Sequence, residues 1–153
     1  MPRRIIKLFL ENIVFWIEPA AMRLVRIEKG AWKGDQILAA GAWSVLDDQN
    51  YWKGDFTKCF FASNALMAEV KTCLFALTWA KQQHWKFLEI KSDCLVMIQM
   101  LQKGNEQHYE VTNVINDIKN LASNFAWCSI VKVSRNDVQQ AQNAAKLCLI
   151  SCT

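Results

Sequence analysis

The order of strand-like and helical segments is the feature that most constrains the fold of this chain. Three segments that resemble strands follow one another from about residue 27, and the second of them, 37–46, is closed by the turn-forming residues 47–50. Helical and strand-like segments then alternate from about residue 65 to residue 150. This order predicts an α/β fold with a mixed sheet, antiparallel at first and parallel later.

The later elements can be placed more closely by their apolar spacing and their boundary residues. Apolar side chains recur every three or four positions over 110–125, which makes this the clearest helix in the chain. Ser63-Asn64 offers an N-cap for an earlier long helix, and Gly104 can end the helix that follows Ser92-Asp93. The remaining expected elements are strands at 55–61, 87–90 and 127–133 and a last helix at 138–150.

Residues 5–17 form an apolar segment that precedes this pattern. Lys7, Glu11 and Glu18 fall on one face of a helix, which predicts an amphipathic helix that packs on the domain or on a protein partner. The segment is too short and too polar to span a bilayer, and Glu11 interrupts the apolar run that a secretory signal needs. We therefore expect no membrane span and an intracellular protein, nuclear or cytoplasmic, that is not secreted.

The positive charge is concentrated at the N-terminus, which suggests a boundary near residue 26. The chain carries 18 Lys+Arg and 14 Asp+Glu, which gives a net charge of +4. Residues 1–26 hold five basic and two acidic groups, so the rest of the chain holds thirteen basic and twelve acidic groups. We expect an N-terminal segment over 1–26 and one domain over 27–150. With a net charge near +1, that domain does not have the basic composition typical of a surface covered in phosphate-binding groups.

Six cysteines are present, but their spacing predicts neither a zinc site nor a disulfide framework. They form no CxxC pair and have no histidine at a spacing typical of zinc ligands. We expect reduced thiols that pack as small apolar side chains.

Two carboxylates occupy positions at which α/β proteins often place chemistry. Glu69 lies in the early turns of a helix, and Asp93 follows a strand, where open sheets bind their ligands. Each also has a purely structural interpretation, because acids near a helix start interact favourably with the helix dipole and Asp is a common N-cap. The residues alone leave both interpretations open.

Several motifs, in the same order along the chain, resemble the plant ribonuclease H-like family related to retroelement domains. They are Gly30-Ala31-Trp32, Ala40-Gly41-Ala42-Trp43-Ser44-Val45-Leu46, Ser63-Asn64-Ala65-Leu66-Met67-Ala68-Glu69, Ser92-Asp93-Cys94 and Val133-Ser134-Arg135. The resemblance covers roughly residues 27–150. It implies a ribonuclease H-like fold, a five-stranded mixed sheet with three antiparallel and then parallel strands, flanked by helices. It also implies a nuclease that cuts the RNA strand of an RNA–DNA hybrid with Mg²⁺ or Mn²⁺.

The family's four catalytic carboxylates are only half present in this chain. By resemblance, Glu69 and Asp93 fill the second and third positions and are the implied catalytic residues and metal ligands. The first-strand acid falls on Lys29, and the acid of the last helix falls on Gln142. Four carboxylates offer two Mg²⁺ ions about −4 of charge, whereas Glu69, Asp93 and Lys29 sum to about −1. We expect hybrid cleavage to be weak or absent.

The leading functional hypothesis is therefore a nucleic-acid-binding domain with a degenerate nuclease site. Lys132 and Arg135 flank the start of the last helix and are the expected phosphate contacts, although they also fit an ordinary solvated surface. The alternative is a non-catalytic protein-interaction module on a vestigial nuclease fold, in which the helix over 5–17 recruits a partner. A gene fragment without a selected role is a third possibility.

Overall fold

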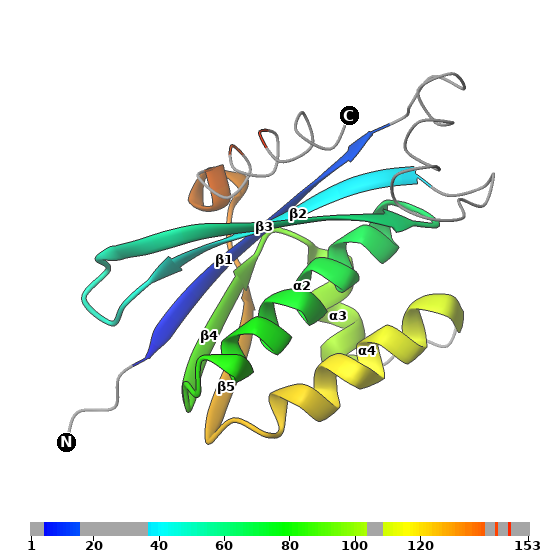
Figure 1. The fold of residues 1–153 in the computed structure, drawn as a ribbon. Helices are drawn as coiled ribbons and strands as arrows, with labels where there is room; N and C mark the ends of the chain where they lie inside the picture. Colours follow the sequence, from blue (N-terminus) through cyan, green and yellow to red (C-terminus); the bar gives the residue numbers. More distant parts are fainter. Residues whose placement is uncertain (1–4, 16–36, 104–108, 140–142, 144–146, 148–153) are drawn as a thin grey trace.

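A single five-stranded sheet forms the centre of the molecule (Figure 1). The computed structural model describes residues 5–15, 37–103, 109–139, 143 and 147. The strands are β1 (Ile6–Phe15), β2 (Ile37–Leu46), β3 (Trp52–Ala62), β4 (Phe87–Ser92) and β5 (Trp127–Lys132), in the order β3-β2-β1-β4-β5. β1, β2 and β3 are antiparallel neighbours, β4 is parallel to β1, and β5 is parallel to β4. The expected mixed sheet is confirmed.

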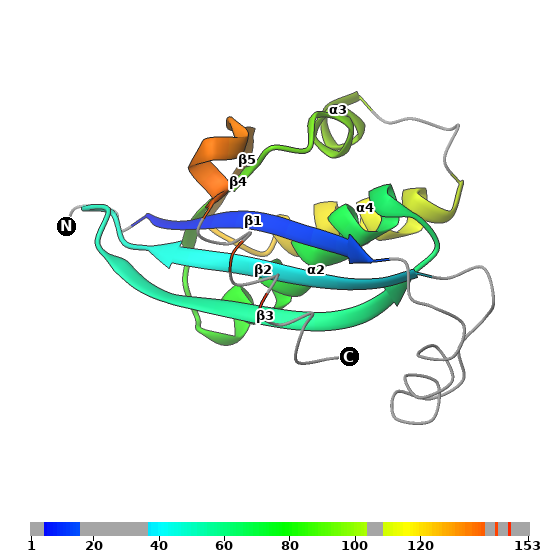
Figure 2. The same ribbon diagram turned by 90° about the horizontal axis from the view of Figure 1, so that it is seen from above.

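Three helices accompany the sheet, and a short 3₁₀ helix follows β5. They are α2 (Ala65–Gln82), α3 (Leu95–Lys103), α4 (Tyr109–Ala122) and η1 (Arg135–Val138). α2 lies across β1 and β2 and packs against α4, while η1 lies beside β1. Figure 2 shows β1, β2 and β3 running side by side in one twisted layer. No helix within the described residues is long and apolar enough to cross a membrane.

α2 begins where the sequence predicts it. The side chain of Asn64 accepts a hydrogen bond of 2.8 Å from the backbone N–H of Met67, which satisfies one of the free donors at the helix start. Along the helix, Val70, Cys73 and Leu77 are fully buried, as their spacing predicts for the face that covers the sheet. This packing places the whole length of α2, including Glu69, over the central strands.

Residues 6–15 form strand β1, so the prediction of an amphipathic helix over 5–17 is wrong. Leu8 and Leu10 are buried while Lys7 and Phe9 are only half-buried, which is the period of two typical of a strand. β1 pairs with β2 on one side and with β4 on the other, and these neighbours outweigh the local helical pattern. A helix that recruits a protein partner through this segment does not form.

A truncation at Leu8 tests the central position of β1. We expect Leu8→Ala to lower the free energy of unfolding by about 3 kcal/mol, because it removes a fully buried side chain from the core under α2. Phe9→Ala, on the half-buried face of the same strand, serves as the matched control and should cost less. Urea denaturation of the two variants measures the difference, and equal costs would contradict the strand assignment.

Candidate nucleic-acid interface

Strands β4 and β5 end together, level with the middle of β1. Leu10 of β1 pairs with Ser92 of β4, and Ser92 pairs in turn with Lys132 of β5. Asp93 follows Ser92 directly, so a carboxylate and the cationic Lys132 lie at the same edge. The carboxyl ends of parallel strands are where α/β sheets bind ligands, and here they carry charges of both signs.

Glu69 and Asp93 both lie near Cys94, at the start of α3. Burial, together with the negative charges of Glu69 and Asp93, raises the pKa of the Cys94 thiol to about 11. Glu69 projects from α2 and Asp93 from the turn after β4, so both carboxylates lie close enough to Cys94 to act on the same thiol. Both are half-buried. The structure therefore places each of the two acids that the sequence singles out near Cys94.

The purely structural interpretations of these acids find less support in the geometry. The first turn of α2 contains no acidic residue, and Glu69 lies beyond it, where the helix dipole has little effect. At the start of α3, the hydroxyl of Ser92 accepts a hydrogen bond of 3.1 Å from the backbone N–H of Cys94. A side chain other than Asp93 thus binds the backbone at this turn.

Lys132 and Arg135 are exposed at the end of β5 and just after it. Lys132 is the last residue of β5, and the chain then bonds back to β4 because the N–H of Val133 donates to the carbonyl of Ser92 at 2.9 Å. Arg135 opens η1, where the hydroxyl of Ser134 donates to Asp137 at 2.9 Å and holds the turn. The two cations are therefore anchored by backbone contacts to the edge that carries Asp93.

The other two expected positions, Lys29 and Gln142, lie outside the described residues. The family pattern predicts Lys29 on the first strand of the sheet, whereas β1 (Ile6–Phe15) occupies that place between β2 and β4. The roles of both residues stay predictions.

The prediction of a helix over 5–17 leaves one acid of β1, Glu11, out of the candidate site. Glu11 follows Leu10 and pairs with Ala42 of β2, so the backbone register brings it level with Asp93. It is the single acidic residue of β1, and a strand assignment would have identified it.

The donor set fits one magnesium ion better than two. No group of three or more His, Cys, Asp or Glu side chains that could hold a metal occurs within the part of the chain described above. Mg²⁺ commonly takes one or two carboxylates and completes its shell with water and substrate phosphate. Glu69 and Asp93 supply that number, whereas a second ion would need ligands from elsewhere in the chain.

The cysteines only partly follow the expectation of reduced thiols. Cys73, Cys94 and Cys128 are free, and Cys73 is fully buried under α2. Cys59 of β3 is disulfide-bonded, which corrects the expectation for this residue. Burial raises the pKa of Cys128 to about 11 and raises that of Cys73 further still. These thiols are packing groups, because a thiol with a raised pKa is a poor nucleophile at neutral pH.

The raised thiol pKa values predict slow alkylation and a loss of stability in alkali. At pH 8 the thiolate fraction of Cys94 should be about 100-fold below that of an unfolded thiol, so iodoacetamide should label Cys94 slowly in the folded chain.

The same thiols predict a loss of stability in alkali. Unfolded thiols lose their protons near pH 9 and the folded Cys94 and Cys128 near pH 11, so the free energy of unfolding should fall as the pH rises through this window. Mass spectrometry and urea denaturation check the two effects. Rapid labelling of native Cys94 at pH 8 would contradict this assignment.

The sequence profile of the reverse transcriptase-like family matches residues 28–148 of this chain. The match begins after β1 and includes Glu69, Asp93, Lys132 and Arg135. None of the curated proteins matches the chain.

Solved structures of ribonucleases H share the fold. RNase H1 from Halobacterium salinarum NRC-1 is 16% identical with a TM-score of 0.76, covering 96% of this chain and 98% of its own. The N-terminal RNase H domain of a Mycobacterium tuberculosis protein is 14% identical with a TM-score of 0.69, and 96% of each chain is covered. LC11-RNase H1, isolated from compost by a metagenomic approach and solved with an RNA/DNA hybrid, is 10% identical with a TM-score of 0.67, covering 90% of this chain and 91% of its own.

Proposed function

The chain belongs to the reverse transcriptase-like family, and from this premise we propose that it binds an RNA–DNA hybrid and cleaves it weakly or not at all. One observation carries the proposal: Glu69 and Asp93 both lie near Cys94, just after β4, and Lys132 ends the neighbouring strand β5, with Arg135 just beyond it. Phosphates need cations, and an activating ion needs carboxylates, so both requirements are met at one edge of a ribonuclease H fold. LC11-RNase H1, which shares this fold, was solved with a hybrid.

In this proposal, Lys132 and Arg135 contact phosphates on one strand and fix the position of the hybrid over the edge. Arg135 can bind a phosphate through two parallel hydrogen bonds, whereas Lys132 acts as a point charge. The carboxylates of Glu69 and Asp93 would hold Mg²⁺ or Mn²⁺, and the ion, when bound, would stabilise negative charge on the scissile phosphate. We propose that cleavage is weak because Lys29 and Gln142 replace two acids of the family pattern.

Reversing the two cations tests the interface. We expect Lys132→Glu with Arg135→Glu to weaken hybrid binding and to reduce the magnitude of the slope of log K against log[salt] by about 2. The reason is that each lost phosphate contact reduces the magnitude of this slope by about 0.9. Lys86→Glu with Lys119→Glu is the control, since it changes the net charge equally at exposed sites near the other end of β4 and β5. Fluorescence anisotropy with a labelled blunt hybrid measures both, and equal slopes for the two double variants would exclude Lys132 and Arg135 from the interface.

A protein-interaction role is the second candidate, favoured by two exposed apolar side chains beside the site. Leu95 and Val96 open α3 directly after Asp93 and Cys94 and are 47% and 45% exposed. Apolar side chains at a charged edge fit a protein surface better than a phosphate backbone. Failure of the unaltered chain to bind any hybrid would favour this role over the first.

A further inference from the structure

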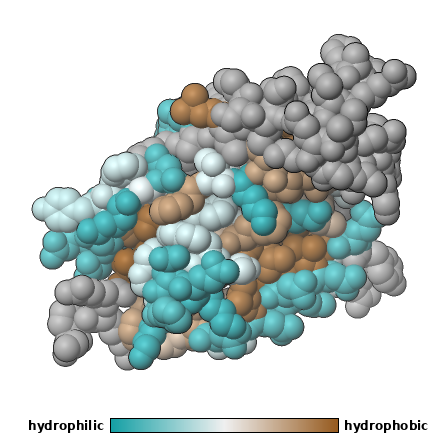
Figure 3. All heavy atoms as spheres, in the orientation of Figure 1, coloured by the Kyte–Doolittle hydropathy of each residue, from teal (hydrophilic) through white to brown (hydrophobic). Residues whose placement is uncertain are grey.

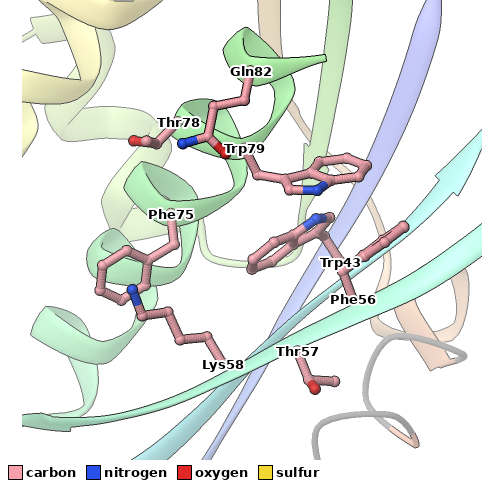
Figure 4. Close-up of a pocket in the computed structure, with 8 residues that line it drawn as sticks. All are labelled: Trp43, Phe56, Thr57, Lys58, Phe75, Thr78, Trp79 and Gln82. Carbon is pink, nitrogen blue, oxygen red and sulfur yellow. The ribbon is translucent and has the colours of Figure 1, made fainter.

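A pocket of about 310 Å³ lies between the second half of α2 and strands β2 and β3, away from the carboxylates (Figure 4). It is lined by Trp43, Phe56, Thr57, Lys58, Phe75, Thr78, Trp79 and Gln82. Figure 3 shows apolar surface interrupted by hydrophilic side chains on the face of the molecule seen in Figure 1. The volume is at the lower end of the range typical of small-ligand sites.

Aromatic rings form the walls of this pocket. The ring centroids of Phe56 and Trp79 are 4.2 Å apart, and those of Trp43 and Trp79 are 5.9 Å apart. Phe56 is 36% exposed, and Trp79 is half-buried. Partly exposed aromatic side chains attract flat rings, and nucleic-acid bases stack on such side chains with little regard to sequence.

The polar groups of the pocket suit an anion attached to such a ring. Lys58 is the single charged side chain in the lining, and no acid lines the pocket. The Nζ of Lys58 lies 4.0 Å from the ring centroid of Phe75, and its side chain is exposed. Figure 4 shows the Nζ of Lys58 next to Phe75, at one side of the pocket. A phosphate joined to a stacked base would meet this ammonium and no opposing carboxylate.

The floor of the pocket also contains a donor that lacks an acceptor. The indole Nε1 of Trp43 is buried and has no hydrogen-bond partner among the described residues. Figure 4 shows the nitrogen-bearing edge of Trp43 turned toward Trp79. A carbonyl or ring nitrogen of a base that reached this N–H would supply the missing acceptor.

We propose that this pocket binds one unpaired nucleobase with its phosphate. The base would come from a single-stranded extension of the nucleic acid at the Glu69–Asp93 edge, so the inference rests on the proposed function. Nine residues of α2 separate Glu69 from Thr78, a distance of about 14 Å along the helix. A stacked strand advances about 3.4 Å per nucleotide, so an extension needs about four nucleotides to reach the pocket.

Hybrids of one sequence with three different ends test the inference. Anisotropy titrations compare a blunt hybrid with hybrids carrying single-stranded DNA extensions of two and eight nucleotides. The eight-nucleotide extension should tighten binding about tenfold, as one stacked base does, and the two-nucleotide extension should not. Thr78→Phe, which fills the pocket from an exposed position, should abolish the gain. Lys58→Gln should reduce it, and Lys53→Gln, on the same strand but outside the pocket, should leave it unchanged.

Each outcome separates this inference from the proposed function. If the blunt hybrid binds and the long extension adds nothing, or if Thr78→Phe and Lys58→Gln both keep the gain, the pocket does not bind a base. If no hybrid binds while uridine or adenosine monophosphate binds and Thr78→Phe abolishes it, the pocket takes a free nucleotide and the proposed function is wrong. Monophosphate binding at least as tight as binding of the hybrid with the eight-nucleotide extension would likewise identify a free nucleotide as the source.

Discussion

Single-turnover cleavage of a labelled RNA–DNA hybrid by the unaltered chain, with Mg²⁺ or Mn²⁺, is expected to stay close to background. In-line hydrolysis of a phosphodiester usually needs one ion to activate the water and a second to stabilise the leaving oxygen. Among the described residues, Glu69 and Asp93 can serve one ion, and no group of three ligands forms. The expected result is therefore hybrid binding with little turnover.

Restoring the two missing acids is expected to increase cleavage. Lys29→Asp combined with Gln142→Asp should raise the single-turnover rate by at least about 100-fold, because the two changes restore the family's four carboxylates and add about −3 of charge to compensate the metal ions. Either change alone should do much less, since both act on one shared site and their effects are strongly non-additive.

Two further variants control this experiment. Glu11→Gln in the double variant shows whether β1 contributes an acid, as its register beside Asp93 allows. Asp93→Asn in the unaltered chain defines the background. Strong cleavage by the unaltered chain that is abolished by Asp93→Asn would contradict the degenerate site and restore an ordinary nuclease.

Gly41→Val is expected to lower the free energy of unfolding by about 4 kcal/mol. Gly41 lies in the middle of β2, where α2 crosses it, and a Cβ placed there would collide with the hydroxyl of Thr72. Thr72 is buried and donates a hydrogen bond of 2.9 Å to the carbonyl of Ala68, so it cannot move away without losing this bond. Overpacking and the lost hydrogen bond account together for the cost.

A double-mutant cycle shows whether the collision with Thr72 is the cause. Thr72→Ala in the Gly41→Val background removes the colliding atoms and should recover at least about 1.5 kcal/mol relative to the sum of the single changes. Urea denaturation at constant pH measures all four proteins. Additive costs would place the strain at another neighbour of Gly41.

The sequence predicts the fold well wherever one local pattern decides it. β2 has the predicted bounds, and the turn after it is held by Asp47, whose side chain accepts from the N–H groups of Gln49 and Tyr51 at 2.9 Å. The Tyr51 bond lowers the pKa of Asp47. β1 could not be predicted, because an apolar segment with scattered charges fits a helix as well as a strand until its neighbours are known.

The candidate site was predictable in its parts but not in its assembly. Glu69 and Asp93 could be placed on α2 and after β4 from their local patterns. That Lys132 lies opposite Ser92 depends on the register of β5, which no local pattern specifies. The aromatic pocket was missed for the same reason, since Trp43, Phe56 and Trp79 meet only when α2 packs on β2 and β3.

Salt-dependent binding of the unaltered chain to a blunt RNA–DNA hybrid, compared with a DNA duplex of the same sequence, tests the central claim most directly. If the sheet edge with Lys132 and Arg135 is a nucleic-acid interface, log K for the hybrid should fall linearly with log[salt] with a slope of about −2 or steeper. The hybrid should also bind more tightly than the duplex at every salt concentration. Absence of hybrid binding at about 50 mM salt, where phosphate contacts are weakly screened, would contradict the account.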